Sequence, residues 1–144
     1  MRKTMNEILQ TQGLCVLATT SGDEPHCSLM AYDTDSSCRN IYLITHQNTK
    51  KHRNLKENPR VSLLVDTRVS DKETASDQVQ ALTVRGSVVA MAADEQVEVV
   101  RERFLERHRH LTAFAQHPDA VLMKVRIESL QLLRGAVESY YEEA

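Results

Sequence analysis

Short apolar runs that end in turn-forming residues recur along the chain, and this pattern limits the possible folds more than any other feature. Residues 14–20 read Leu-Cys-Val-Leu-Ala-Thr-Thr and are followed at once by Ser-Gly-Asp-Glu-Pro. A short apolar run that stops at such a turn is typical of a buried strand. Similar runs predict further strands at residues 26–32, 40–45, 60–66, 81–91, 121–127 and 129–133.

Few helical patterns interrupt these strands. Residues 3–12 form one amphipathic pattern, and Asp94 is placed to cap a second helix that ends before Pro118. Phe104 and Phe114, both in this second pattern, are expected to belong to the core. Because strands and helices do not alternate regularly, the sequence favours a mainly β (α+β), antiparallel barrel or sandwich over a doubly wound parallel sheet. Gly86, inside the 81–91 strand, predicts a bend or a bulge at that point.

Length and charge narrow the functional classes. The chain has 144 residues, which suits a single domain over residues 1–144. A formal net charge of -2 removes any general attraction to nucleic acid or anionic lipid, so we expect neither partner. No apolar run approaches the roughly 20 residues that span a bilayer, and the opening residues lack the apolar core of a secretory signal. These features predict a cytoplasmic protein.

Cysteines and histidines do not indicate a metal or disulfide site. The three cysteines include no C-x-x-C pair, which suits reduced thiols. Cys15 and Cys27 fall in predicted strands and are expected to be buried, whereas Cys38 lies in a polar loop and is expected to be exposed. His108 and His110 are two residues apart on a predicted helix and do not face each other, so no metal site is predicted.

The basic segment after the 40–45 strand contains a local electrostatic conflict. Thr49 is a good helix N-cap, which places Lys50 and Lys51 in the first turn of a helix. The free N–H groups there already carry roughly half a positive charge, so each lysine costs a few tenths up to about 1 kcal/mol. A bound anion resolves the conflict, because N–H groups, a hydroxyl and two ammonium groups then converge on it.

The orientation of this helix supports a phosphate site. Leu55 is its only apolar residue and is expected to face the core, with Lys51 and His52 one turn earlier on the same side. A partly sheltered Lys51 makes an unpartnered charge more costly. The alternative is a solvated basic turn whose lysines extend into water.

The order of motifs resembles one known family. Its first part is Leu17-Ala18-Thr19-Thr20, a turn with Gly22, Pro25-His26, and the strand Ile41-Tyr42-Leu43-Ile44-Thr45. Its most specific part is Thr49-Lys50-Lys51-x-x-Asn54-Leu55-x-x-Asn58-Pro59-Arg60-Val61. Together they resemble the pyridoxamine 5′-phosphate oxidase-like flavoproteins. The similarity covers most of the chain and is strongest over residues 14–66.

The resemblance implies an FMN-binding split barrel: a six-stranded antiparallel Greek-key barrel with a few peripheral helices. It also implies a homodimer with two flavins, each held in a groove between subunits. The residues implied to bind FMN are Ser28, Leu29, Met30, Thr45, Thr49, Lys50 and Lys51. The last three hold the phosphate, Thr45 helps to position it, and the first three flank the flavin ring with backbone groups. The implied activity is that of an oxidoreductase on an unknown small substrate.

The sequence also departs from the family. True pyridoxamine phosphate oxidases have an arginine where Ser28 stands and continue with a Trp and an Arg-Leu-x-Pro ending, whereas this sequence has no Trp. We therefore expect the vitamin B6 pocket to be missing. Shorter relatives include FMN-binding or general-stress-type proteins, users of the deazaflavin F420, and haem-handling branches. The rival hypotheses are a haem-binding or haem-degrading protein and a non-catalytic flavin-binding module.

Two questions stay open at this stage. No residue is marked out as a catalytic acid or base, so the catalytic residues are unknown. The charged segment Arg68–Asp77 lacks apolar anchors and is interpreted as a mobile loop. Its sequence does not decide whether it closes over the cofactor.

Overall fold

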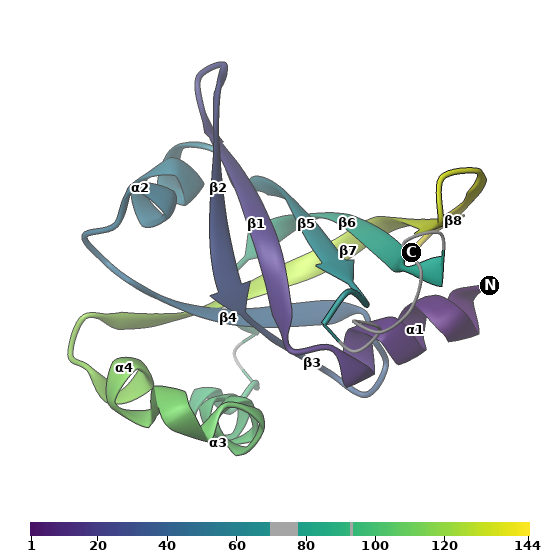
Figure 1. Ribbon diagram of the computed structural model, residues 1–144. Helices are drawn as coiled ribbons and strands as arrows, with labels where there is room; N and C mark the ends of the chain where they lie inside the picture. The colour runs from purple at the N-terminus through teal and green to yellow at the C-terminus, as the bar shows by residue number, and fades with distance from the viewer. Residues whose placement is uncertain (70–77, 93) are drawn as a thin grey trace.

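The computed structural model describes residues 1–69, 78–92 and 94–144, and it shows a strongly curled sheet with helices around the outside (Figure 1). The helices are α1 (Arg2–Thr11), α2 (Lys50–Glu57), α3 (Val97–Arg107), the 3-10 turn η2 (Arg109–Leu111) and α4 (Thr112–Gln116). The strands are β1 (Leu14–Ser21), β2 (Glu24–Ala31), β3 (Asp33–Thr34), β4 (Asn40–His46), β5 (Arg60–Asp66), β6 (Gln80–Val89), β7 (Ala120–Arg134) and β8 (Glu138–Glu143).

The strands pair in the order β2-β1-β5-β6-β7-β4-β3, with β8 added to β7, and every pairing is antiparallel. The strands at the two ends of this order, β2 and β3, are separated in the chain only by Tyr32. The sheet therefore curls until its ends meet in one stretch of chain. This arrangement confirms the predicted mainly β, antiparallel barrel with peripheral helices.

The runs predicted as separate strands at 121–127 and 129–133 form the single strand β7. The number of strands also differs from the six that the resemblance implies. The described residues form an 8-stranded sheet. One additional strand is β3, which is separate from β2 because Tyr32, between them, belongs to neither strand. Tyr32 instead donates its N–H to Gly13 O over 3.0 Å. The other is β8, which the sequence analysis did not predict. It returns along β7 after a turn in which Gly135 adopts a φ of 59°, a conformation that favours glycine.

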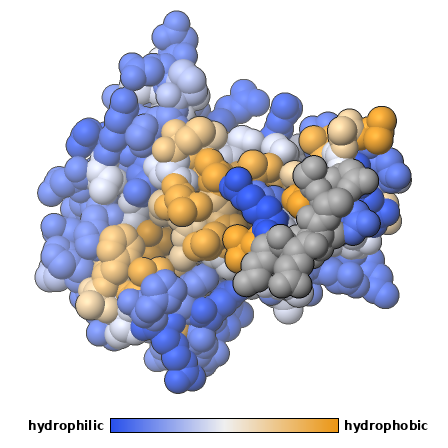
Figure 2. Space-filling view, in the orientation of Figure 1, coloured by the Kyte–Doolittle hydropathy of each residue, from blue (hydrophilic) through white to orange (hydrophobic). Residues whose placement is uncertain are grey.

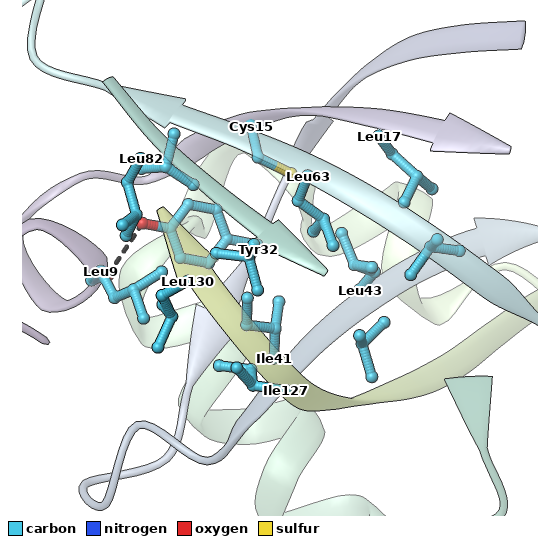
Figure 3. Packing of buried hydrophobic residues seen from close by; sticks show 14 of the residues in the cluster. Leu9, Cys15, Leu17, Tyr32, Ile41, Leu43, Leu63, Leu82, Ile127 and Leu130 are labelled. Atoms are coloured by element: carbon cyan, nitrogen blue, oxygen red, sulfur yellow. Dashed lines mark hydrogen bonds between the residues drawn. The ribbon is translucent and has the colours of Figure 1, made fainter. Parts of the chain in front are cut away.

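Apolar side chains fill the interior of the barrel (Figure 3). Tyr32, Leu43, Leu82 and Leu130 are each fully buried there. The hydroxyl of Tyr32 donates to Leu9 O over 2.8 Å, so the polar end of this ring is satisfied where α1 covers the barrel. Because side chains occupy the interior of so small a barrel, a cofactor has to bind on its outside.

Gly86 lies at a bulge between β6 and β7, as predicted. The register shifts there, so that Gly86 pairs with Ile127 while the residue before it pairs with Ser129. A Cβ atom at this position would lie 2.3 Å from Arg126 O. The close approach of the two backbones therefore requires a residue without a side chain.

Helix α3 begins later than predicted. Its N-cap is Gln96, without a side-chain capping bond, and Asp94 is exposed in the preceding turn. The Glu95 carboxylate holds this turn, because its Oε1 accepts from Ala92 N over 2.8 Å and from Lys124 Nζ over 2.5 Å. The helix starts only after this anchored segment.

Two further expectations concern the loop predicted at residues 68–77 and the crossing of a membrane. Of the loop predicted at 68–77, residues 70–77 lie outside the described residues. In the ranges that the structure describes, none of the helices combines the length and hydropathy that crossing a bilayer requires.

Candidate functional site

Helix α2 starts as the sequence predicts. Thr49 is its N-cap, and the Thr49 Oγ1 atom accepts a hydrogen bond from His52 N over 3.3 Å. Lys50 and Lys51 occupy the first turn, which contains no acidic residue. The predicted conflict between two ammonium groups and the positive end of the helix is therefore present in the structure.

Threonine hydroxyls order this helix start. Thr49 Oγ1 donates to His46 O over 3.0 Å and lies 3.3 Å from Thr45 Oγ1. Since the single hydroxyl hydrogen of Thr49 is used on His46, Thr45 is the donor in the threonine pair. Thr45 is fully buried at the end of β4. Its hydroxyl therefore orients the cap and is not available at the surface.

An acidic residue from β2 offsets part of the charge. Lys50 Nζ lies 3.3 Å from Glu24 Oε1, and the two side chains are 47% and 70% exposed. Exposed pairs of this kind contribute about 0–1 kcal/mol. Lys51 is half-buried, as predicted, and forms no ion pair among residues 1–69, 78–92 and 94–144. The carboxylate of Glu24 is the partner that sequence reasoning missed.

Two asparagines fasten α2 to β1. Asn54 is buried beside the predicted core residue Leu55 and donates to Thr19 Oγ1 over 3.1 Å. Asn58 donates to Thr20 Oγ1 over 2.8 Å. The four-residue spacing of the asparagines places both on one side of the helix, a signal that the sequence analysis overlooked.

The predicted ring-flanking residues lie on β2, the same strand that begins with Glu24. Ser28 is half-buried, Leu29 is 71% exposed and Met30 is buried. Because β2 ends the sheet order, no other described strand pairs with the outer edge of these residues. The ion pair between Lys50 and Glu24 joins this strand to the start of α2, so both predicted parts of the site share one edge of the barrel (Figure 1).

An apolar face lies beside this edge. It consists of Leu14, Val16, Leu29 and Leu64, where Val16 pairs with Leu29 on one side and Leu64 on the other. Figure 2 shows apolar side chains gathered on this side of the molecule. A shallow hollow of ≈ 250 Å³ is lined by this face together with residues 12–15, 66, 68 and 69. Contiguous exposed apolar surface of this kind marks an interaction site.

A stack of three rings adjoins the start of α2. The ring of His46, at the end of β4, lies between the rings of Phe114 and His117, with centroid distances of 4.1 and 4.7 Å. The sequence analysis left all three out of the site. Phe114 was moreover expected in the core, but its side chain, on α4, is 39% exposed and its ring stacks on His46.

Two of the expected thiol environments are wrong. Cys38 is fully buried and Cys27 is exposed. The loop that carries Cys38 folds against α1, where Arg2 donates to Cys38 O over 3.1 Å. Burial raises the pKa of the Cys38 thiol. Cys27 is on the outward side of β2, opposite Ala18 of β1.

His108 joins helices to the barrel. Its Nε2 atom donates to Tyr32 O over 2.7 Å, and burial lowers the pKa of its imidazole. The adjacent Arg107 pairs with Asp33 over 3.1 Å and donates to Leu9 O over 3.1 Å. The rings of His108 and His110 meet edge to face, with centroids 6.2 Å apart, and the described residues contain no cluster suited to a metal ion.

Solved structures show where this fold recurs, although no curated protein matches the sequence. A haem-binding protein from Mycobacterium smegmatis has a TM-score of 0.83 at 17% identity, over 96% of this chain and 55% of its own. General Stress Protein 26 from Bacillus anthracis str. Sterne has a TM-score of 0.73 at 19% identity, over 100% of both chains. An FAD-binding protein from Mesorhizobium loti has a TM-score of 0.71 at 16% identity, over 92% of this chain and 93% of its own.

These similarities establish the fold, and the sequence itself establishes the family. At identities of this level the three structures say nothing of which cofactor this chain holds, and the chain spans about half the length of the mycobacterial protein. The family described as pyridoxamine 5′-phosphate oxidase matches residues 1–134, which include α2, β2 and the apolar face. The chain therefore belongs to the pyridoxamine 5′-phosphate oxidase family.

Proposed function

We propose that this protein binds FMN at the outer edge of the barrel and acts as a flavin-dependent oxidoreductase on a small substrate. Family membership supports a flavin-type cofactor, and one feature of the structure carries the proposal. That feature is the start of α2, beside the edge of β2. The backbone N–H groups of Lys50 and Lys51 have no acceptor within the helix there, and both lysine side chains lie in the same turn.

The backbone donors at the start of α2 fit a phosphate group. Thr49 satisfies His52 N through its hydroxyl over 3.3 Å and Arg53 N through its carbonyl over 3.1 Å. The amides of Lys50 and Lys51 have no acceptor within the helix, because they precede its first intrahelical bond. Two such amides with two ammonium groups suit a doubly charged phosphate.

The remainder of the cofactor has a place beside the phosphate. Backbone groups of Ser28, Leu29 and Met30 on the unpaired edge of β2 are available to hydrogen-bond the polar rim of a flavin ring. The apolar face next to them shelters the ring from water. When bound, FMN supplies hydride or electron transfer, and the protein supplies binding, orientation and electrostatic tuning.

A homodimer would complete the site. The apolar face of one subunit is exposed, and Leu29, its most exposed member at 71%, lies on β2 beside the predicted ring position. Covering this face with a second copy would bury it and enclose each flavin between two subunits. We therefore propose that the cofactor lies in the groove where two subunits meet.

The absorbance spectrum of the purified protein tests the cofactor. We expect absorbance bands close to those of free flavin. After the protein is denatured, the released cofactor should have the fluorescence emission spectrum of FMN. Three outcomes contradict the proposal: a Soret band, which would indicate haem; the spectrum of F420; or no binding of added flavin, which would indicate a non-catalytic module without this cofactor.

A double variant tests the location. Lys50→Ala combined with Lys51→Ala removes two charge-assisted contacts, so we expect FMN affinity to fall by about 30-fold, corresponding to about 1 kcal/mol for each lysine. The matched control is Lys3→Ala with Lys56→Ala, which removes the same charge from exposed positions of α1 and the last turn of α2. Equal affinities of the two double variants would refute this location.

A further inference from the structure

The ring stack at the end of β4 holds His46 from both sides. The rings of His46 and Phe114 are nearly parallel, with an interplanar angle of 11°, and those of His46 and His117 are inclined by 22°. Both partners come from the connection between α3 and β7, a segment far from His46 in the sequence. Rings stacked on two faces have little freedom to change rotamer.

Hydrogen bonds add direction to this stack. His46 Nε2 donates to Phe114 O over 2.9 Å, which fixes the tautomer of the ring in this arrangement. The next residue, Gln47, donates its N–H to Asp119 O over 3.0 Å. The side chain of His46 and the following backbone amide are therefore both tied to residues 114–119.

The same histidine is tied to the cap of α2. His46 O accepts from Thr49 Oγ1 over 3.0 Å, and Thr49 Oγ1 in turn accepts from His52 N over 3.3 Å. The asparagine bonds that fasten α2 to β1 come from Asn54 and Asn58, in its second half and at its C-cap. The position of the first turn thus depends on the 46–49 segment. The pairing of β4 with β7 holds the backbone at His46, and the stack holds its side chain.

From this chain of contacts we infer that His46 is a positioning residue for the anion site. Its stack with Phe114 and His117 sets the place of the Lys50 and Lys51 amides, and so the affinity for the phosphate end of the cofactor. This inference rests on the proposed function, because it concerns the phosphate of the same flavin. It gives a role to helices α3 and α4, which lie between β6 and β7 in the chain: they support the site from outside the barrel.

Comparing FMN with riboflavin, which lacks the phosphate, isolates this role. We expect His46→Ala to weaken FMN binding about tenfold while riboflavin affinity stays within twofold of wild type. Phe114→Ala removes one face of the stack and should act in the same direction. The control is His110→Ala, because His110 is exposed and its ring meets that of His108, outside the stack.

A conservative variant separates the stack from general stability. His46→Phe keeps a ring between Phe114 and His117 but loses the Nε2 donor, and we expect it to restore FMN affinity to within threefold of wild type. A loss of fold stability would weaken FMN and riboflavin equally. Equal weakening, or unchanged FMN affinity in His46→Ala, overturns the inference.

Hydrogen exchange in the flavin-free protein gives a readout that needs no cofactor. We expect the amides of His52 and Arg53, which are hydrogen-bonded to Thr49, to exchange at least fivefold faster in His46→Ala than in wild type, and no change in His110→Ala. Unchanged exchange in His46→Ala refutes the positioning role by itself. If the wild-type protein binds neither FMN nor riboflavin, the proposed function is wrong. The exchange experiment is independent of that outcome, because it can still show that the stack orders α2.

Discussion

Lys50 at the start of α2 and Glu24 at the start of β2 form an ion pair in which Nζ and Oε1 lie 3.3 Å apart. The pair connects the two halves of the proposed cofactor site across 26 residues of sequence. Both side chains are largely exposed, so the attraction is screened by water and salt. The Lys50 ammonium group is therefore paired with Glu24 but can exchange this carboxylate for another anion.

Glu24→Gln should therefore strengthen phosphate binding. Removing the carboxylate frees Lys50 and removes a repulsive charge near the phosphate, so we expect FMN affinity to rise about two- to fivefold at low ionic strength. The gain should shrink in about 0.5 M salt, and isothermal titration at both salt concentrations measures it. Glu106→Gln, an exposed change on α3, is the control. Weaker FMN binding by Glu24→Gln would show that this carboxylate supports the site.

A charge in the apolar face should separate the proposed dimer. Leu29 is the most exposed residue of that face, so Leu29→Glu would place a carboxylate from each subunit in an apolar contact, and the cost of burying it exceeds about 2 kcal/mol. We expect sedimentation equilibrium to show a monomer for Leu29→Glu. Val137→Glu, at the 94% exposed tip of the β7–β8 turn, should leave the assembly unchanged. A monomeric wild type would disprove the dimer.

The bulge at Gly86 should not tolerate a side chain. A Cβ atom there meets Arg126 O at 2.3 Å, and relief requires the backbones of β6 and β7 to move apart. We expect Gly86→Ala to lower the free energy of unfolding by about 1–3 kcal/mol, measured by urea denaturation. Gly22→Ala is a useful contrast, because a Cβ at Gly22 meets no atom within 4 Å, although its φ of 59° still disfavours alanine. A stable Gly86→Ala variant would contradict the observed register.

Acid should reduce the stability that depends on His108 being buried as a neutral ring. Burial lowers the pKa of His108 below its ordinary value of 6.5, so the unfolded chain takes up the proton at a higher pH than the folded protein does. The stabilisation is complete above pH 6.5 and is lost as the pH falls toward the lowered pKa. We expect the difference in unfolding free energy between wild type and His108→Gln to shrink from pH 7.5 to pH 5. A difference independent of pH would show that His108 is not buried as a neutral ring.

Much of the candidate site was accessible to sequence reasoning because its signals are local. A capping hydroxyl on Thr49 and the placement of Lys50 and Lys51 depend only on residues within one helical turn. Gly86 likewise marked its bulge, because a glycine inside an alternating strand is typical of a place where two backbones approach closely. The predicted burial of Leu55 followed from its being the single apolar residue of the helix.

The wrong burial predictions share a cause: whether a side chain is buried depends on the segment that packs against it in the folded protein. Cys38 was expected to be exposed because its sequence neighbours are polar, yet α1 covers it. Phe114 was assigned to the core from its chemistry, yet its packing partner is His46 at the surface. Neither partner is close in sequence, so no periodicity could have revealed it.

The amino-acid sequence by itself determined the alternation of strands and turns, the start of α2 and the accumulation of positive charge there. These properties follow from backbone preferences and side-chain chemistry within a few residues. Only the tertiary structure decided that β2 brings Glu24 to Lys50, that Leu29 lies exposed in an apolar face, and that His46 is held between two distant rings. Such pairings arise when the curled sheet brings remote segments together, and packing in three dimensions then selects the partners.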